Sequence, residues 1–326
     1  FSFPQKTFKS YITFNNFRCF QFASPLFSST RLSEIVISKS SFRKFSNVQL
    51  FMNFNDQIYD TTESGKTYHE CKIMTAVSFI DCTFIEMISD TLNLIEAGHN
   101  VHFDHCRFIN STNDQKALLY LKDSMNCIIS NTQFMDNSLS KVIHSSQNLV
   151  NITISYTNFS RNIVAGSLLV LVCHTTCLQN LIISDNAAAT SIISLQNQRA
   201  LLEDNCVVDG IQLVRNTYSK TVCYDFQLNF ESYIMPNCTF NRISISNTIT
   251  QTMYYHFLIQ KYNTKLFLIN CCFSNSEDKI KTPNNFEIIW ENTEMNQDCF
   301  DLNPKKAQYG IIGDEYVELE IPRRLL

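Results

Sequence analysis

An eight-residue pattern recurs along the chain, and its spacing constrains the fold more than any other feature. The pattern reads apolar, any, apolar, three linking positions that end in a small residue or Cys, then any residue and Phe. Between Phe84 and Phe159 the copies end 24 to 26 residues apart. A near-constant period of this length predicts a stack of one repeating unit, because a unit so short cannot bury its own apolar face. Clear copies end at Phe42, Phe84, Phe108, Phe134, Phe159, Phe240 and Phe273, and eroded copies end at Ala188 and Val208.

The interior of each copy predicts a strand that ends at a corner. The two apolar positions that open a copy lie two residues apart, as Val101 and Phe103 do, and such alternation is typical of strands. The alternation then breaks, so we expect the chain to turn there. Asn and Asp tolerate the left-handed backbone that a corner of this kind needs. They occupy the corner position at Asp81, Asn131, Asp185, Asn205, Asn237 and Asn270.

A second apolar segment follows most copies, so each unit would hold two or three short strands and form one coil. We therefore expect an all-β fold, a single-stranded right-handed parallel β-helix (solenoid) of about ten coils with terminal caps. Residues 1–277 would form the β-helix with its N-terminal cap, and residues 278–326 a C-terminal cap or a connection to further chain. The final Phe residues would stack in one interior column. A second interior column would hold Ser40, Cys82, Cys106, Thr132, Thr157, Asn186, Cys206, Cys238 and Cys271.

These Cys-x-Phe endings and the abundance of Asn resemble a known class of repeat. The sequence is similar to the right-handed parallel β-helix proteins of the pectin-lyase-like superfamily. More narrowly, it resembles the Asn-rich Cys-x-Phe repeat regions of large protist surface proteins and of polymorphic outer-membrane proteins. The resemblance covers about residues 10–275. It implies an extracellular or cell-surface location.

Composition excludes several classes of function. The net charge is only −4 and no basic cluster exists, so we expect no nucleic-acid partner. No run of eighteen apolar residues exists, so we expect no membrane span within this segment. The first ten residues lack the features of a signal peptide, which fits a mature or excised fragment of a longer protein. No phosphate-binding loop or nucleophile elbow occurs, and we expect no cofactor.

Cysteine and sequon positions give the candidate modification sites. The chain has 13 cysteines, and those of the interior column are interpreted as small apolar fillers. Cys173 and Cys177 are the best local candidates for a disulfide. Asn-x-Ser/Thr sequons, which are potential glycosylation sites, occur at Asn110, Asn151, Asn158 and Asn237.

Residues 98–106 hold the densest group of metal-ligating side chains. The candidates are His99, His102, Asp104 and His105, which are residue types that suit Zn²⁺. His102 and Asp104 would share the outward face of a strand, with His105 at the corner. Because a strand directs its side chains to opposite sides, convergence of three ligands is disfavoured. We expect an exposed His-bearing strand and no functional metal site.

A polysaccharide-cleaving site on this fold would need clustered carboxylates on one outer face. The acidic candidates are Asp104, Glu203, Asp204 and Asp209. Asp104 and Asp204 would share a column but lie roughly 14–20 Å apart at the spacing of stacked strands. That separation is too large for a retaining or inverting pair.

We therefore expect a non-catalytic surface or extracellular scaffold, structural or adhesive, and not an enzyme. Its loops and flat faces would bind a glycan or protein ligand. Two alternatives stay open: a polysaccharide lyase or glycoside hydrolase on the same fold, and a subunit of an extracellular filament or assembly. Self-association is favoured by an outward apolar ridge, expected at Ile182, Leu202, Ile234 and Phe267.

Overall fold

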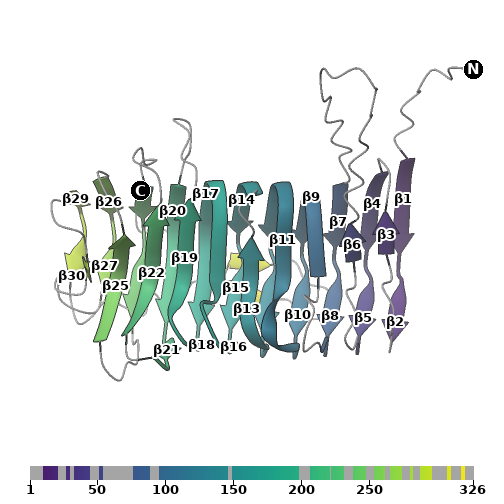
Figure 1. The fold of residues 1–326 in the computed structure, drawn as a ribbon, viewed down its shortest axis with the longest axis horizontal. Coiled ribbons are helices and arrows are strands. Elements are labelled where there is room, and N and C mark those ends of the chain that lie inside the picture. The colour runs from purple at the N-terminus through teal and green to yellow at the C-terminus, as the bar shows by residue number, and fades with distance from the viewer. Residues whose placement is uncertain are drawn as a thin grey trace, which may run out of the picture.

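The computed structural model is built of parallel β-strands stacked side by side (Figure 1). The residues that it describes contain no helix, and 28 of their strands join in one continuous sheet. The expected all-β parallel solenoid is therefore confirmed. The described residues are 10–20, 27–29, 33–44, 51–53, 76–88, 95–145, 149–197, 206–220, 222–230, 238–246, 253–260, 265–273, 280–281, 287–295, 307–309 and 317–319.

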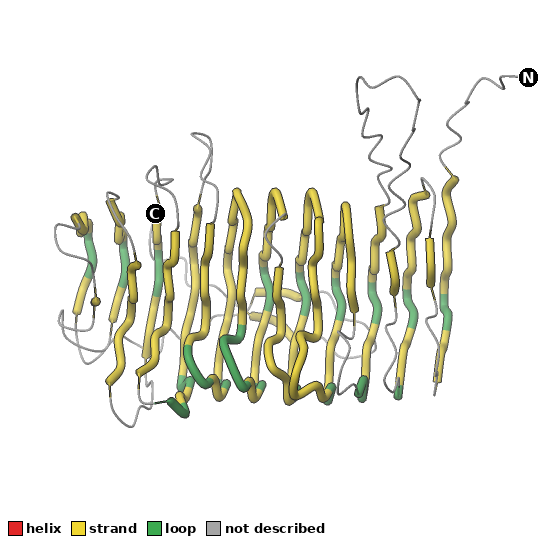
Figure 2. Tube along the Cα trace, viewed as in Figure 1, coloured by secondary structure: helices red, strands yellow, loops and turns green. Residues whose placement is uncertain are grey.

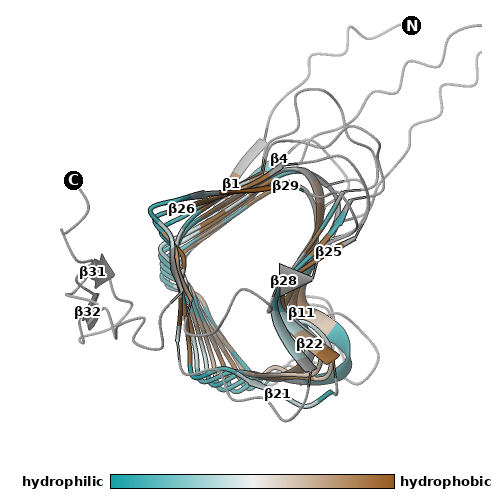
Figure 3. Ribbon diagram, turned by 90° about the vertical axis from the view of Figure 1, so that its left-hand side faces the viewer, coloured by the Kyte–Doolittle hydropathy of each residue, from teal (hydrophilic) through white to brown (hydrophobic). Residues whose placement is uncertain are grey.

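The continuous sheet folds into three faces around one interior, which Figure 3 shows from the end of the stack. The first face holds β1 (Ser10–Asn15), β4 (Ser33–Ser38), β7 (Ala76–Ile80), β14 (Leu149–Ser155), β23 (Cys238–Asn241), β26 (Lys265–Ile269) and β29 (Glu287–Glu291). The second face holds β2 (Arg18–Phe20), β5 (Ser41–Arg43), β8 (Thr83–Ile85), β10 (Arg107–Ile109), β12 (Gln133–Met135), β15 (Asn158–Ser160), β24 (Ser244–Ser246), β27 (Cys272–Phe273) and β30 (Glu294–Met295).

The third face completes each coil. It holds β13 (Ser138–Ser145), β16 (Ile163–Val164), β18 (Ala187–Ala188), β19 (Ser191–Asn197), β21 (Thr217–Tyr218), β22 (Val222–Phe230), β25 (Met253–Gln260) and β28 (Ile280–Lys281). Four long strands pass from one face to the next: β9 (Ile95–Asp104), β11 (Thr112–Ser130), β17 (Leu169–Ser184) and β20 (Cys206–Val214). Two pairs lie outside this sheet: parallel β3 (Phe27–Ser29) and β6 (Phe51–Asn53), and antiparallel β31 (Ala307–Tyr309) and β32 (Val317–Leu319).

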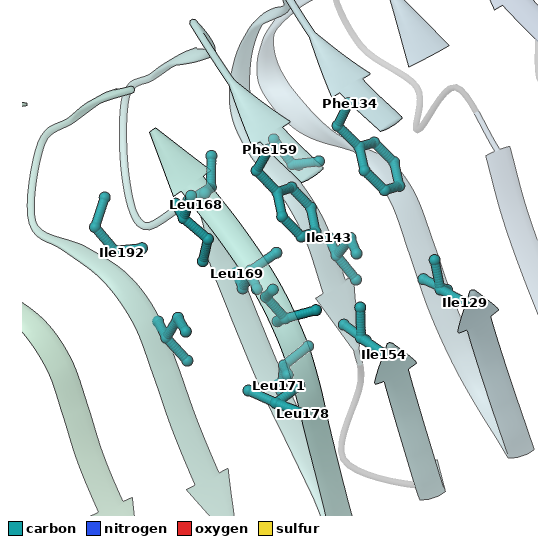
Figure 4. Packing of buried hydrophobic residues seen from close by; sticks show 14 of the residues in the cluster. Ile129, Phe134, Ile143, Ile154, Phe159, Leu168, Leu169, Leu171, Leu178 and Ile192 are labelled. Carbon is teal, nitrogen blue, oxygen red and sulfur yellow. The ribbon is translucent and has the colours of Figure 1, made fainter. Parts of the chain in front are cut away.

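The predicted phenylalanine spine is present where the repeat period is constant. Phe84, Phe108, Phe134 and Phe159 are 0% exposed and pair in successive strands of the second face. Their ring centroids lie 4.5, 4.7 and 4.8 Å apart, with planes 4° apart or less. Figure 4 shows Phe134 above Phe159 beside aliphatic residues of the same interior. Aromatic rings stacked at this spacing stabilise the fold beyond the stabilisation that burial of their apolar surface provides.

Beyond Phe159 the predicted register is confirmed at Phe273 but is wrong at Ala188, Val208 and Phe240. Phe159 pairs with Ile183, and not with Ala188, and the column continues through Leu213 and Ile245 to Phe273. Leu178, Val208 and Phe240 instead share the inward column of the first face with Ile154. The error arose because an apolar residue at every second position is satisfied equally by a strand of the first face or the second.

The interior cysteine column needs the same correction. Cys82 and Cys106 lie directly after the corner and are 0% exposed, as predicted. Their Sγ atoms lie 3.3 Å from the carbonyl oxygens of Ile37 and Phe79 respectively. Cys206 and Cys238, in contrast, pair with each other on the first face. Asn186 belongs to a different interior column, which follows the second corner.

Left-handed residues mark both corners of a coil (green in Figure 2). The first corner is confirmed at Asp81, Asn131 and Asn270, whereas Asp185 lies at the second corner and Asn205 and Asn237 lie outside the described residues. Within the described chain, seven coils have both corners, fewer than the ten or so expected. Their first and second corners pair as Lys39 with Lys44, Asp81 with Glu86, His105 with Asn110, Asn131 with Asp136, Tyr156 with Arg161, Asn180 with Asp185, and Gly210 with Arg215.

A ladder of buried asparagines follows the second corner. Asn137, Asn162, Asn186 and Asn216 are 1% exposed or less. The Nδ2 of each of the first three donates to the Oδ1 of the next residue, at 2.8, 2.9 and 3.1 Å. Each Nδ2 also reaches a main-chain carbonyl of the coil before, such as that of Phe134 for Asn162, at 2.9 Å. The ladder therefore satisfies polar groups that the sharp corner would otherwise leave without partners.

The stack continues past the expected boundary at residue 277. β29 pairs with β26, β30 with β27 and β28 with β25, so the described solenoid extends to Met295. A separate C-terminal cap in the remaining residues stays a prediction. The prediction that Ile182 belongs to the outward apolar ridge with Phe267 is wrong, because Ile182 pairs with Asn158 on the second face. Phe267 does point outward, whereas Leu202 and Ile234 lie outside the described residues.

Candidate functional site

The third face carries an aromatic and basic group on its outer side. Tyr120 pairs in register with His144, one coil further along the stack. Their ring centroids lie 5.2 Å apart with planes inclined by 52°. Both side chains are half-buried. The next outward residues of this column, Val170 and Ser194, are only 7% and 1% exposed, and the face bends inward in the end view (Figure 3).

Two lysines lie beside this pair. Lys141 is half-buried on the same strand as His144, and a Cβ added to Gly166 would lie 4.0 Å from Lys141 Cγ and Cε. Lys116 is exposed, because a β-bulge between Asn113 and Ala117 displaces it from the strand ladder. The bulge is held by the buried Asn113 side chain, whose Oδ1 accepts the Lys116 N–H at 2.8 Å.

Burial and mutual repulsion set the protonation of this group. Burial, and then the charges of Lys141 and Lys116, lower the pKa of His144 to about 4. Burial and then the charge of Lys116 also lower the pKa of Lys141. His144 is therefore neutral at pH 7 and has a lone pair that can accept a proton. Perturbed ionisable groups that gather on one surface are typical of functional sites.

The same face carries a second aromatic pair further along the axis. Tyr224 and Tyr255 stack with centroids 6.0 Å apart and planes inclined by 22°. Ser191 pairs with Tyr224, and Tyr224 pairs with Tyr255, so the three residues form one outward column. The strand pairings of the two preceding coils place Lys141 in the same column. The two groups therefore lie along one line parallel to the solenoid axis, roughly 14 Å apart at the spacing of stacked strands.

A different polar cluster is enclosed inside the solenoid. Asp225 and His256 are 0% exposed. The residues on either side of them are paired between coils, and these pairings place both in the column that holds Ile192 one coil earlier. Asp225 accepts hydrogen bonds from Tyr218 at 2.5 Å, from Tyr254, and from His256 Nδ1 at 2.9 Å. Burial and then the Asp225 charge raise the pKa of Tyr218 well above its usual value. His256 Nε2 has no hydrogen-bond partner.

The residues considered for a metal site do not converge. His102 points outward from the first face, and His105 lies at the corner with φ 51°. His105 Nδ1 lies 2.9 Å from Asp104 Oδ2, while Ser130 and Asn131 donate to Asp104 Oδ1 at 2.6 and 2.9 Å. Burial acts to raise the pKa of Asp104, but these three hydrogen bonds together lower it. The side chain of His99 lies outside the described residues. Over the described ranges, no group of three His, Cys, Asp or Glu residues is placed to hold a metal ion.

The carboxylates considered for a polysaccharide-cleaving site do not form a cluster among the described residues. Asp209 binds Arg242 through two hydrogen bonds of 2.8 and 2.5 Å and also accepts one from Asn241 at 2.9 Å. Asp104 and Asp209 share an outward column, separated by Ser130, Ser155 and Gln179. Glu203 and Asp204 lie outside the described residues.

The cysteine and sequon candidates take different positions. Cys173 and Cys177 are thiols, and Cys173 Sγ lies 2.9 Å from Thr176 Oγ1. Cys272 is disulfide-bonded.

The sequon asparagines differ in accessibility. Asn110 is exposed at the second corner. Asn151 donates to Asn126 at 2.9 Å, and Asn158 Oδ1 is buried without a hydrogen-bond partner. Asn237 lies outside the described residues.

Sequence reasoning missed Tyr120, Lys141 and His144, although a signal existed. Tyr120 and His144 are 24 residues apart, which is the coil period, and they fall in the segments interpreted only as apolar strands. Applying the period to every residue type, and not only to Phe and Cys, would have paired them.

No protein-family model matches the chain, and no curated protein matches it. Two of the solved structures that match are described. One is the catalytic unit of a thermostable GH87 alpha-1,3-glucanase from Streptomyces thermodiastaticus strain HF3-3, with 11% identity and a TM-score of 0.31. The other is a variant catalytic domain of a GH87 alpha-1,3-glucanase in complex with tetrasaccharides, with 11% identity and a TM-score of 0.30. Each match covers 88% of this chain, which spans only 63% and 61% of the two solved chains. At this identity the likeness concerns the fold alone.

The expectation of a non-catalytic scaffold is withdrawn. That prediction, with its statement that the chain is not an enzyme, rested on the wide separation expected between Asp104 and Asp204 and on the resemblance to surface proteins. A fold does not determine function, so the β-solenoid form gives no ground for excluding catalysis. The part of the chain that the structure describes contains no helix with the length and hydropathy needed to cross a bilayer.

Proposed function

We propose that the chain is a polysaccharide-cleaving enzyme of the lyase type, with its site on the outer side of the third face. The observation that carries the proposal is the combination of a neutral His144, the ring of Tyr120 and the cations of Lys141 and Lys116 on one surface. Positive charge beside an available base suits an acidic polymer made of uronic acid units. A hydrolase would instead need two carboxylates at a defined separation.

The chemistry needs a base, a source of positive charge and a proton donor. His144 would take the proton from the carbon next to the uronate carboxylate, and the electron pair of that bond would form a carbon–carbon double bond. The bond to the glycosidic oxygen breaks, and the leaving oxygen takes a proton from the Tyr120 hydroxyl. Lys116, the exposed cation, would stabilise the negative charge that builds up on the carboxylate during proton removal.

The second aromatic pair would extend the site along the polymer. Tyr224 and Tyr255 present stacked rings on the same line as Lys141. An aromatic side chain offers a large apolar contact area together with a polar hydroxyl, which suits the mixed surface of a sugar. The polymer would therefore run along the solenoid axis.

An assay of unsaturated product tests the proposal. The chain is incubated with polygalacturonate, with alginate and with α-1,3-glucan, and the ultraviolet absorbance of the new conjugated double bond is followed. We expect absorbance to rise with a polyuronate, and we expect His144→Gln to lower kcat at least a hundredfold, as for loss of a general base. Lys116→Met should also lower kcat, because the charge that Lys116 stabilises builds up only during proton removal.

The matched control is His102→Gln, which changes a half-buried outward histidine on the first face. It should leave the rate unchanged. Absence of unsaturated product from every polyuronate, or full activity of His144→Gln, would overturn the proposal, and so would hydrolysis of α-1,3-glucan that is insensitive to His144.

The proposal includes membership of the pectin-lyase-like superfamily, in its protist surface-protein type, and an extracellular or cell-surface location. A polysaccharide substrate of this kind lies outside the cell, and the disulfide at Cys272 is typical of an oxidising compartment. The exposed Asn110 would then carry a glycan, whereas Asn158, with its buried Oδ1, would not. Expression through a secretory pathway, followed by glycan release and peptide mapping, separates the two sites.

A further inference from the structure

Both ends of the described solenoid have strands that are paired on one side only. At the N-terminal end, β1 pairs with β4 and β2 with β5. At the C-terminal end, β29 pairs with β26 and β30 with β27. No other described strand pairs with these four. An unpaired strand edge is a template on which another strand can add.

Within the described residues, apolar side chains are exposed at both ends of the interior columns. Ile12 is 41% exposed, although Ile35, its neighbour in the same inward column, is 5% exposed. Trp290 is 40% exposed, although Leu268 before it is 0% exposed. Both residues belong to columns that are buried between the two ends, and an apolar column that ends in solvent favours an apolar partner.

We propose that a second copy of this chain docks on these edges, with the C-terminal end of one copy stacked on the N-terminal end of the next. All strands of the solenoid run parallel, so such stacking continues the sheet in the same direction. It also continues the two inward columns of the first face, because the first and last residues of each are apolar. Continuation places Ile288 beside Ile12 and Trp290 beside Phe14 of the next copy.

Charge supports the same direction of stacking. Arg18 is exposed at the N-terminal edge, and the pairings along the second face place Glu294 in the column that begins with Arg18. Glu291 is exposed at the C-terminal edge, in the column that begins with Asn15. Opposite charges at the two ends favour head-to-tail contact and disfavour the contact of two like ends.

The geometry predicts open assembly. A head-to-tail contact joins two different surfaces, so each added copy leaves one free edge of each kind. We expect the average mass to rise continuously with concentration and not to stop at a dimer. Trp290 is the only tryptophan of the chain, so its emission should shift to shorter wavelength as the edge is covered.

Charge reversal at the two edges tests the contact. Sedimentation velocity is measured over a wide range of concentration for the parent chain, for Arg18→Glu and for Glu294→Arg. Each variant alone places like charges in one column, and we expect the association constant to fall about tenfold. Mixing the two variants restores opposite charges at every contact and should restore assembly. Asp114→Arg reverses an exposed charge in the middle of the solenoid and serves as the control.

Several outcomes would overturn the proposal. They are a constant monomer mass with unchanged Trp290 emission at all concentrations, a closed dimer, and a mixture of the two variants that assembles no better than either alone. Cleavage of polysaccharide by a fully monomeric chain would overturn this inference while leaving the proposed activity intact.

Discussion

Replacing Asn162 by Ala should be costly, although it removes only a small polar side chain. Asn162 is 0% exposed and makes four side-chain hydrogen bonds within the ladder. Its Oδ1 accepts from the Asn137 main-chain N–H at 3.2 Å and from Asn137 Nδ2 at 2.8 Å. Its Nδ2 donates to the Phe134 carbonyl and to Asn186 Oδ1, both at 2.9 Å.

The loss of stability depends on which hydrogen-bond partners of Asn162 are left without any other bond. Asn137 Nδ2 keeps a bond to the Phe108 carbonyl, and Asn186 Oδ1 keeps one from the Asn162 main chain. The Asn137 N–H and one acceptor position of the Phe134 carbonyl remain buried without a partner. A buried polar group left in this way costs about 1–3 kcal/mol, so we expect Asn162→Ala to lower the free energy of unfolding by about 3 kcal/mol.

The chain offers a matched control in an exposed asparagine ladder. Asn126 accepts from Asn151 at 2.9 Å and donates to Asn100 at 3.1 Å, but it lies in solvent. Water replaces both partners when it is removed, so Asn126→Ala should change the stability by less than about 0.5 kcal/mol. The two variants therefore differ in burial and not in the type of bond lost.

Urea unfolding followed by circular dichroism measures both variants. A solenoid need not unfold in one step, so midpoints are compared only where the slope of the transition is unchanged. Asn162→Asp is a useful third variant, because a buried carboxylate cannot donate to the Phe134 carbonyl and should cost at least as much as Ala at pH 7. Equal midpoints for Asn162→Ala and Asn126→Ala would refute the reasoning.

Three further predictions concern the spine, the corner ion pairs and pH. Phe134→Ala removes a ring that is 0% exposed between Phe108 and Phe159, and it should cost about 3–5 kcal/mol in the same urea assay, with Phe134→Leu costing clearly less. A small effect of Phe134→Ala would show that the rings do not share one packed interior. Arg161 makes two hydrogen bonds to Asp136, at 2.7 and 2.8 Å, but its side chain is 57% exposed, so Arg161→Ala should cost less than about 1 kcal/mol, and the cost should shrink in high salt. A cost that is large or independent of salt would contradict this. The pKa of His144 is lowered from 6.5 to about 4, so the unfolded chain binds the proton first, and stability contributed by neutral His144 is lost as pH falls through that window. The difference in melting temperature between the parent and His144→Gln should therefore be constant above pH 6.5 and should shift against the parent as pH falls from 6.5 to 4. A difference that stays constant over the whole range would contradict the lowered pKa.

The part of the fold that the sequence predicts well is the part where the coil length is constant. Phe84, Phe108, Phe134 and Phe159 end successive coils of nearly equal length, so one alignment satisfies all of them. Each strand was predicted from alternation alone, and burial alternates as expected in β7. The period and the pleat are local properties, and local properties are visible in sequence.

The part that failed is the register of the coils after Phe159. Leu181 and Ile183 alternate like a strand of the first face, but they lie after the corner at Asn180 and belong to the second. Where the number of residues per coil increases, the constant period no longer predicts which residues pair. Alternation of apolar residues alone cannot distinguish the first face from the second, because both face the same interior. The site on the third face was missed for a related reason, since His144 and Lys141 acquire their lowered pKa values from burial and from Lys116 on a neighbouring coil.

Polar ladders, more than the apolar core, determine which residues of neighbouring coils lie side by side. Sliding one strand by two residues keeps every apolar side chain inside, so the core alone tolerates the slip. The same slip would separate Asn162 from Asn186 and leave buried amides without partners, which costs several times more than a lost surface contact. Inside the later coils Asp225 and His256 act in the same way, because their hydrogen bond forms only when the two strands are in register. An alignment that matched Asn to Asn before matching apolar to apolar would have placed Ile183 under Phe159, because Asn186 lies 24 residues after Asn162, as Ile183 does after Phe159.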